Sequence, residues 1–114
     1  MTSLPLLCAR AALDKQATQV QIFHTQSALA DYVIICSGQS NRQVQAIAES
    51  ARMTLLTAGC RLRRHEGLKD GRWIVMDFGD VILHIFQQTI REYYDLESTM
   101  ADAERIEIPH TFYQ

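Results

Sequence analysis

Residues 32–36, Tyr-Val-Ile-Ile-Cys, restrict the folds available to this chain more than any other segment. They form a continuous apolar run of strand length, and three of the five side chains are β-branched, which favours a strand. A strand without polar alternation is typical of a sheet whose two faces are both covered, as helices cover the sheet in α/β proteins. The run therefore predicts a buried strand in a helix-covered sheet.

The hydrophobic period changes directly after this strand, from a continuous run to a helical stripe. Ser37-Gly38 ends the strand, and Ser40 with Gln43 fits a capping box, in which each side chain satisfies a free backbone N–H. Apolar residues three to four positions apart then mark one helix face: Val44, Ile47, Ala48, Ala51 and Leu55. Gly59 is a typical C-terminal stop. This segment is the clearest helix that the sequence predicts.

Shorter patterns predict the other elements. Helices are expected over 4–16 and 88–100, and strands over 20–24, 61–67, 73–78 and 81–86. Asp70-Gly71 and Gly79-Asp80 are turn signals that join the last three strands into an antiparallel meander. We therefore expect an α/β fold: a single domain over residues 1–106, with a mixed β-sheet and flanking helices on one or both faces. Residues 107–114, which include Pro109, are expected to form a loosely held C-terminal tail.

Composition excludes several classes of function. The chain has 114 residues, enough for one domain that buries roughly two-thirds of its unfolded surface. Its formal net charge of −2 gives no global positive field that would attract nucleic acid or an anionic membrane. No stretch reaches the ~18 apolar residues of a membrane span, and there is no basic region typical of a signal peptide. Three cysteines at no metal-like spacing favour a reducing, cytoplasmic location.

Charge and aromatic residues are distributed unevenly along the chain. Five basic residues lie between 61 and 72, and six acids lie between 92 and 107. The basic residues are expected to form a solvated edge strand, with contact to RNA as the alternative. The lone Trp73 fits either the core or a binding hot spot. Tyr93 and Tyr94 point about 100° apart on a helix, so we do not expect both to be fully buried.

Three motifs suggest chemistry, and each has a simpler explanation. Asp77, Asp80 and His84 could hold a divalent cation with a phosphate substrate, but acids in turns commonly accept backbone hydrogen bonds. Asp77-Phe78-Gly79 matches a protein-kinase tripeptide, but the other kinase motifs are missing. Cys36 has no obvious base and is expected to be a buried, inert thiol. The sequence thus favours recognition by a surface over catalysis.

Four segments together resemble the ribosomal silencing factor RsfS (Iojap) family. They are Ser37-Gly38-Gln39-Ser40-Asn41-Arg42-Gln43, Glu66-Gly67 with Gly71-Arg72-Trp73, Phe78-Gly79-Asp80-Val81, and residues 91–97. They occur in the family's order and spacing, over about residues 4–103. The resemblance implies a fold related in shape to nucleotidyltransferases but without their catalytic residues. It therefore implies a protein that is not an enzyme and needs no cofactor.

The resemblance also implies binding to the large ribosomal subunit through its ribosomal protein fourteen, at the face where the small subunit docks. Binding there would block subunit joining sterically and repress translation, with at most peripheral contact to ribosomal RNA and no membrane partner. We expect the contact surface to contain the hairpin and helix residues Leu68, Trp73, Ile74, Met76, Tyr94, Asp95 and Glu97. The alternatives are a nucleotidyltransferase-like metal-dependent enzyme using Asp77 and Asp80, and a module that forms a homodimer through the same hairpin.

Overall fold

A mixed β-sheet with the strand order β3-β4-β5-β2-β1-β6 is the frame of the fold in the computed structural model, which describes residues 3–26 and 30–113. The strands are β1 (Thr18–His24), β2 (Tyr32–Gly38), β3 (Arg64–Glu66), β4 (Trp73–Asp77), β5 (Val81–Gln87) and β6 (Glu104–Ile106). The helices are α1 (Leu4–Asp14), α2 (Asn41–Thr57) and α3 (Gln88–Tyr94), with short 3-10 helices η1 (Leu96–Met100) and η2 (His110–Tyr113). β2 lies near the centre, antiparallel to β1 and parallel to β5.

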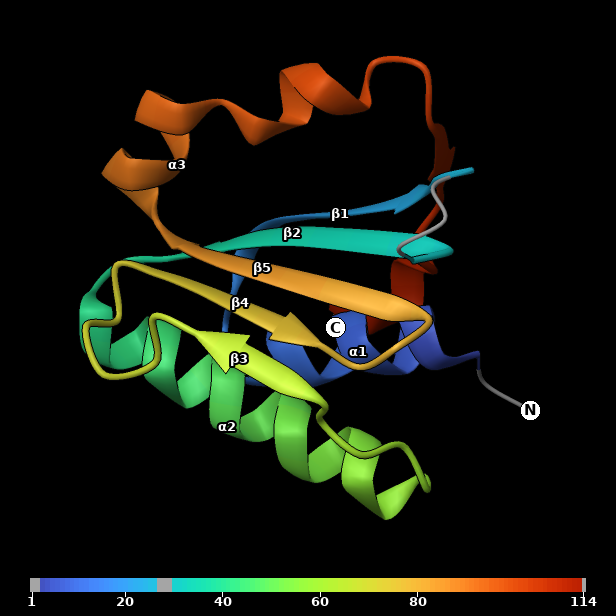
Figure 1. Cartoon of the computed structure of the whole chain (residues 1–114), viewed down its shortest axis with the longest axis horizontal. Coiled ribbons are helices and arrows are strands. Elements are labelled where there is room, and N and C mark those ends of the chain that lie inside the picture. Colours follow the sequence, from blue (N-terminus) through green and yellow to red (C-terminus); the bar gives the residue numbers. More distant parts are fainter. Residues whose placement is uncertain (1–2, 27–29, 114) are drawn as a thin grey trace.

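Helices lie on both faces of the sheet. α1 and α2 lie together against one face, and α3 with η1 lies against the other (Figure 1). From β2, Ile34 and Cys36 enter the main core under α1 and α2, whereas Val33 and Ile35 enter a smaller core under the α3–η1 segment. Burial on both faces explains the continuous apolar run, because alternate side chains of a strand point to opposite faces. The predicted α/β domain with a mixed sheet is confirmed.

The start of α2 is fixed by Ser40 and Gln43, as the capping pattern predicts. Ser40 Oγ accepts a hydrogen bond from the Gln43 N–H at 3.1 Å. The Gln43 side chain reaches one residue further back than a capping box requires, and its Oε1 accepts from the Gln39 N–H at 2.6 Å. Its Nε2 donates to the carbonyl oxygens of Lys15 and Gln16 at 3.0 and 3.1 Å. One side chain therefore ties the β2–α2 turn to the end of α1.

The second half of the chain keeps the predicted order of elements but changes their lengths. β3, β4 and β5 form the expected antiparallel meander. β3 is shorter than expected, fully exposed and at the edge of the sheet, which confirms the solvated edge strand. The helix expected over 88–100 is divided, because Asp95 adopts a left-handed conformation with φ 47°. Such a residue ends an α-helix, and the chain continues as η1.

The C-terminal residues are held against the domain. Residues 104–106 form β6, a strand that the sequence analysis did not predict, with Ile106 opposite Ile22 of β1. Ile108 packs against the main core, and the guanidinium of Arg10 lies 5.1 Å from the centre of the Phe112 ring. Residues 107–113 thus contact the domain at Ile108 and Phe112, and the loosely held tail expected over 107–114 stays a prediction.

Candidate functional site

The face of the sheet that carries α3 and η1 is covered only in part. The smaller core on this face consists of Phe23, Val33, Ile35 and Phe86, packed against residues that include Ile90, Leu96 and Met100. Towards the β3 edge, the same face presents four half-buried side chains from β4 and β5: Trp73, Val75, Ile82 and His84. We call these four residues the open sheet face.

Cross-strand register places the open sheet face on one side of β4 and β5. Val75 lies opposite His84, and Ile82 lies opposite Asp77. The alternate residues of both strands, among them Ile74 and Leu83, are fully buried in the main core. A hollow of about 540 Å³ lies over Val75 and Ile82 and extends to the edge strand β3. This hollow is shallow and mixed in character, because Val75 and Ile82 are apolar whereas residues 63–66 and Asp77 are charged or polar.

Trp73 is the centre of an aromatic cluster that joins the sheet to α3. Its ring stacks on Phe86 of β5 with centroids 4.8 Å apart, and the centroid of the Tyr94 ring, on α3, lies 4.9 Å away. Tyr93 meets Tyr94 edge to face at 5.1 Å. Trp73 itself is half-buried, packing on the smaller core while part of it stays accessible. Trp73 therefore lies partly in the core and partly at the surface, the two positions that the sequence left open.

His84 lies beside Trp73 and is largely buried. Trp73 Nε1 donates a hydrogen bond to His84 Nδ1 at 3.1 Å. Burial lowers the pKa of His84 from 6.5 to about 4, because a low-dielectric environment disfavours the charged imidazolium. The ring is therefore neutral at physiological pH and accepts the indole proton.

Arg91 of α3 connects the α3–η1 segment, which carries the exposed Tyr93 and Tyr94, to the sheet. Only 4% of this residue is exposed. Its Nε donates to Glu97 Oε2 at 3.0 Å, and its Nη1 donates to the Gln19 carbonyl at 2.7 Å and to Ser37 Oγ at 2.9 Å. Gln19 has a positive φ of 51° at an irregularity of β1, so the guanidinium satisfies a carbonyl that the regular ladder leaves free. Arg91 thereby fixes the position of α3 and η1.

The structure separates the expected contact residues into two groups. Leu68, Tyr94 and Asp95 are exposed, and Trp73 is half-buried beside Tyr94. Ile74 and Met76 are 0% and 2% exposed and point into the main core, so they are removed from the expected contact surface. Glu97 is turned towards Arg91, with Oε2 in the ion pair and Oε1 buried without a hydrogen-bond partner. Trp73 and Ile74 are neighbours on β4 and point to opposite faces, and it is the face that carries α3 and η1 that stays partly open.

Sequence reasoning gave no role to His84 beyond a metal ligand and none to Arg91. A polar residue between apolar neighbours on a strand, as at His84, is a signal that the side chain has a specific partner. Arg91 carried only the weaker signal of acids nearby in the sequence, and its partner Glu97 lies six positions later, beyond the i+3 and i+4 spacings at which helical side chains meet. Neither signal identifies the partner without the fold.

The residues considered for chemistry have structural roles. Asp77 Oδ1 accepts a hydrogen bond from the Gly79 N–H at 2.8 Å, which confirms its interpretation as a turn residue. Its Oδ2 lies 3.4 Å from Arg64 Nη2. Within residues 3–26 and 30–113, no three His, Cys, Asp or Glu side chains gather as a metal site would require. Burial raises the pKa of the Cys36 thiol to about 12, so this cysteine is protonated and inert.

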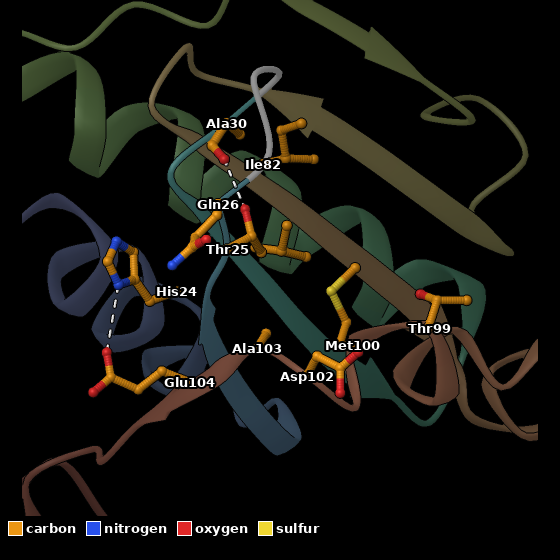
Figure 2. A pocket seen from close by; sticks show the side chains of 11 residues that line it. His24, Thr25, Gln26, Ala30, Ile82, Thr99, Met100, Asp102, Ala103 and Glu104 are labelled. Carbon is orange, nitrogen blue, oxygen red and sulfur yellow. Dashed lines mark hydrogen bonds and ion pairs between the residues drawn. The ribbon is translucent and has the colours of Figure 1, made fainter.

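A second hollow, of about 740 Å³, continues the open sheet face towards the β1–β2 end of the sheet (Figure 2). Ile82 lines both hollows, and Val33 and Met100 add apolar surface here. An ion pair between His24 Nδ1 and Glu104 Oε1, at 3.4 Å, lies at the rim, as Figure 2 shows. The two hollows make one extended, mainly apolar surface beside the α3–η1 segment.

Comparison with known proteins gives the family. A family model described as "Ribosomal silencing factor during starvation" matches residues 2–113. The chain belongs to the RsfS family. The ribosomal silencing factor RsfS of Halalkalibacterium halodurans is 38% identical to it over 104 residues, which cover 90% of this chain and 89% of the relative. The protein of the same name from Bacillus subtilis is 37% identical over 103 residues, 89% and 87% of the two chains.

A solved structure supports the fold independently. The crystal structure of a protein from Chromobacterium violaceum superposes with a TM-score of 0.84 at 30% identity, covering 92% of this chain and 88% of the other. The resemblance drawn from the sequence motifs is therefore confirmed at the level of family and fold. The RsfS relatives are named as silencing factors and not as enzymes, which favours a function in recognition for this chain.

Proposed function

We propose that this RsfS-family protein is a ribosomal silencing factor that binds the large ribosomal subunit through ribosomal protein fourteen. The contact surface in this proposal is the open sheet face together with the exposed residues Leu68, Tyr94 and Asp95. By occupying the subunit-joining face the protein excludes the small subunit and lowers translation. The names of the relatives support the silencing role, and the exposed aromatic cluster supports a docking function.

The arrangement of Trp73 and Tyr94 carries this proposal. Hot spots of protein interfaces are enriched in tryptophan and tyrosine, which bury a large area while losing few rotamers. Here both rings are held in place before binding, Trp73 by Phe86 and Tyr94 by Trp73, so little ordering remains to be done in the complex. A preorganised, partly exposed aromatic pair is expected at a recognition surface.

Charge complementarity favours a basic protein as the partner. Glu92 and Asp95 are exposed on and after α3, next to Tyr93 and Tyr94. Ribosomal proteins are generally basic, so an acidic rim around an apolar surface suits such a partner and steers its approach. The basic residues lie on the opposite side of the hollow, at the β3 edge, where any contact with ribosomal RNA would be peripheral.

The proposed mechanism is steric and needs no bound cofactor. A ligand that binds only free large subunits lowers their available concentration by mass action. We place the protein in the cytoplasm, where subunits join. Within residues 3–26 and 30–113 no helix combines the length and the hydropathy that crossing a membrane requires.

The test is co-sedimentation with separated ribosomal subunits through sucrose at physiological salt. We expect the protein to migrate with the large subunit alone. Trp73→Ala should weaken binding by about 30-fold, corresponding to ~2 kcal/mol for a hot spot. Leu56→Ala, an exposed apolar residue of α2 on the other side of the sheet, is the matched control and should bind like the wild type. Equal binding by both variants would remove the open sheet face from the proposal.

The same surface could serve a homodimer, which is the remaining alternative. Self-association through the open sheet face would hide it from the ribosome, so the two modes would compete. Sedimentation equilibrium over a range of protein concentrations distinguishes them, because Trp73→Ala would then lower the dimer fraction as well as subunit binding.

A further inference from the structure

His84 lies among apolar neighbours on the open sheet face, and the other polar group on this side of β4 besides Trp73, Asp77, is already bonded to the Gly79 N–H and paired with Arg64. Val75 lies opposite His84 on β4, and Ile35 lies opposite it on β2. Trp73, the other residue of this face with a polar atom, already uses its indole N–H inside the protein. His84 is therefore the place where a partner covering this face meets a polar group.

The hydrogen bond with Trp73 fixes the state of the imidazole. An indole N–H can only donate, so His84 Nδ1 must be the acceptor and carries no proton. In a neutral ring the proton then lies on Nε2. Burial keeps the ring neutral at physiological pH. The fold thus selects one tautomer and gives the Nε2 atom the role of donor.

His84 Nε2 is free to bind an external group. Among the described residues, Glu97 Oε1 is the buried polar side-chain atom that lacks a hydrogen-bond partner. His84 is half-buried and its hydrogen bond is the one made by Nδ1. Since Nε2 is not among the buried unpaired atoms, it is accessible at the open sheet face, and its N–H has no hydrogen-bond partner among the described residues. A partner that covers it must supply an acceptor, because a buried unpaired donor costs free energy.

We propose that His84 is a specificity-determining residue of the docking surface, whose Nε2–H donates a hydrogen bond to an acceptor oxygen of the protein partner. This inference rests on the proposed function and names a contact within it. A backbone carbonyl is the acceptor that fits best, because it satisfies the donor without bringing a charge onto the apolar neighbours Val75 and Ile35 of His84. A partner that presents only apolar groups at this point is rejected, since it leaves the donor unpaired.

Two substitutions test the roles of the two His84 nitrogens one at a time. In His84→Asn the amide oxygen takes the place of Nδ1 and can accept from Trp73, but nothing replaces the Nε2 donor. In His84→Gln the terminal amide reaches the place of Nε2 and can donate, but the acceptor for Trp73 is lost. The indole N–H resonance of Trp73, the only tryptophan of the chain, reports whether the internal bond is kept.

The experiment is a titration of labelled protein with purified large subunits, with wild type, His84→Asn, His84→Gln and His84→Met measured together. We expect His84→Asn to keep the indole resonance and to lose about tenfold in affinity, the usual effect of one hydrogen bond at an interface. His84→Gln should bind more tightly than His84→Met, which has a similar shape and no donor. The nitrogen spectrum of the wild-type ring should show an unprotonated Nδ1.

The outcomes distinguish this inference from the function on which it rests. If wild type does not bind large subunits, the proposed function fails and the inference fails with it. If wild type binds and His84→Asn binds equally well, the inference alone is overturned. Should His84→Asn not fold, the comparison of His84→Gln with His84→Met decides, and equal affinities for these two overturn the inference.

Discussion

Replacing Arg91 by methionine tests how the α3–η1 segment is held on the sheet. Methionine keeps the length and most of the apolar stem but removes all donors. The substitution leaves the Gln19 carbonyl, Ser37 Oγ and the Glu97 carboxylate without the guanidinium that now binds them. Ser37 is 0% exposed, so water cannot simply replace the lost partner. We expect the variant to fold with the α3–η1 segment loosened.

The burial of Arg91 sets the magnitude of this effect. Removing one member of a buried, hydrogen-bonded ion pair typically lowers the free energy of unfolding by about 3–5 kcal/mol. Glu97 is partly accessible, at 27% of its side chain, so the lower end of that range, about 3 kcal/mol, is expected here. Domains of this size have free energies of unfolding of about 5–15 kcal/mol, so the loss is a large share of the total.

Urea unfolding followed by Trp73 fluorescence measures this loss. The matched control is Arg52→Met, which breaks an exposed ion pair with Glu49 on α2 and should leave the free energy of unfolding nearly unchanged. A double-mutant cycle with Glu97→Gln should show a coupling above about 1 kcal/mol between the two side chains. A loss below 1 kcal/mol in Arg91→Met, with an unchanged denaturant slope, would refute the reasoning.

Three further predictions concern the loops, the histidine and the thiols. Gly67 has φ +82°, and an added Cβ would lie 2.0 Å from the Trp73 carbonyl oxygen, so Gly67→Ala should lower the free energy of unfolding, measured with urea, by about 1–3 kcal/mol. Gly59→Ala, with φ +89° but open space around it, should lower it less. Because burial lowers the pKa of His84 to about 4, the unfolded chain takes up this proton before the folded one as pH falls. The free energy of unfolding is therefore highest above about pH 6.5 and falls as the pH is lowered from 6.5 to 4, by up to about 3 kcal/mol. His84→Gln should remove this pH dependence, as urea titrations at about pH 6.5 and pH 4 can check. Cys60 is partly exposed whereas the other two cysteines are fully buried, so a thiol reagent should label Cys60 alone in the folded protein, as mass spectrometry of peptides can check.

Local sequence patterns were enough to predict those elements whose own residues show a clear hydrophobic, turn or charge pattern. The apolar run of residues 32–36 and the stripe of α2 are each explained by burial that the pattern itself encodes. The antiparallel meander followed from its turn residues, since Gly79 has the positive φ that the turn signal demands. The edge position of β3 followed from its charges.

Features that depend on a distant partner were not predictable. β6 has only three residues and no period of its own, and it is a strand because β1 offers it a free edge. The break at Asp95 arises where Glu97 returns to Arg91, while Arg91 holds α3 to the sheet through Gln19 and Ser37, both more than fifty positions away in the sequence. Ile74 and Met76 were expected at the contact surface together with Trp73, but neighbouring residues of a strand point to opposite faces, and the structure places both in the main core.

The most direct test of the proposed function is the rate of subunit joining, measured by light scattering when small subunits are mixed with large subunits that carry the protein. We predict that the wild-type protein lowers the amount of joined ribosomes in proportion to the large subunits it occupies. Leu56→Ala should act as the wild type does, and Trp73→Ala should need a roughly 30-fold higher concentration for the same effect. Undiminished joining at concentrations that saturate the large subunit would contradict the proposal that this protein silences ribosomes by steric exclusion.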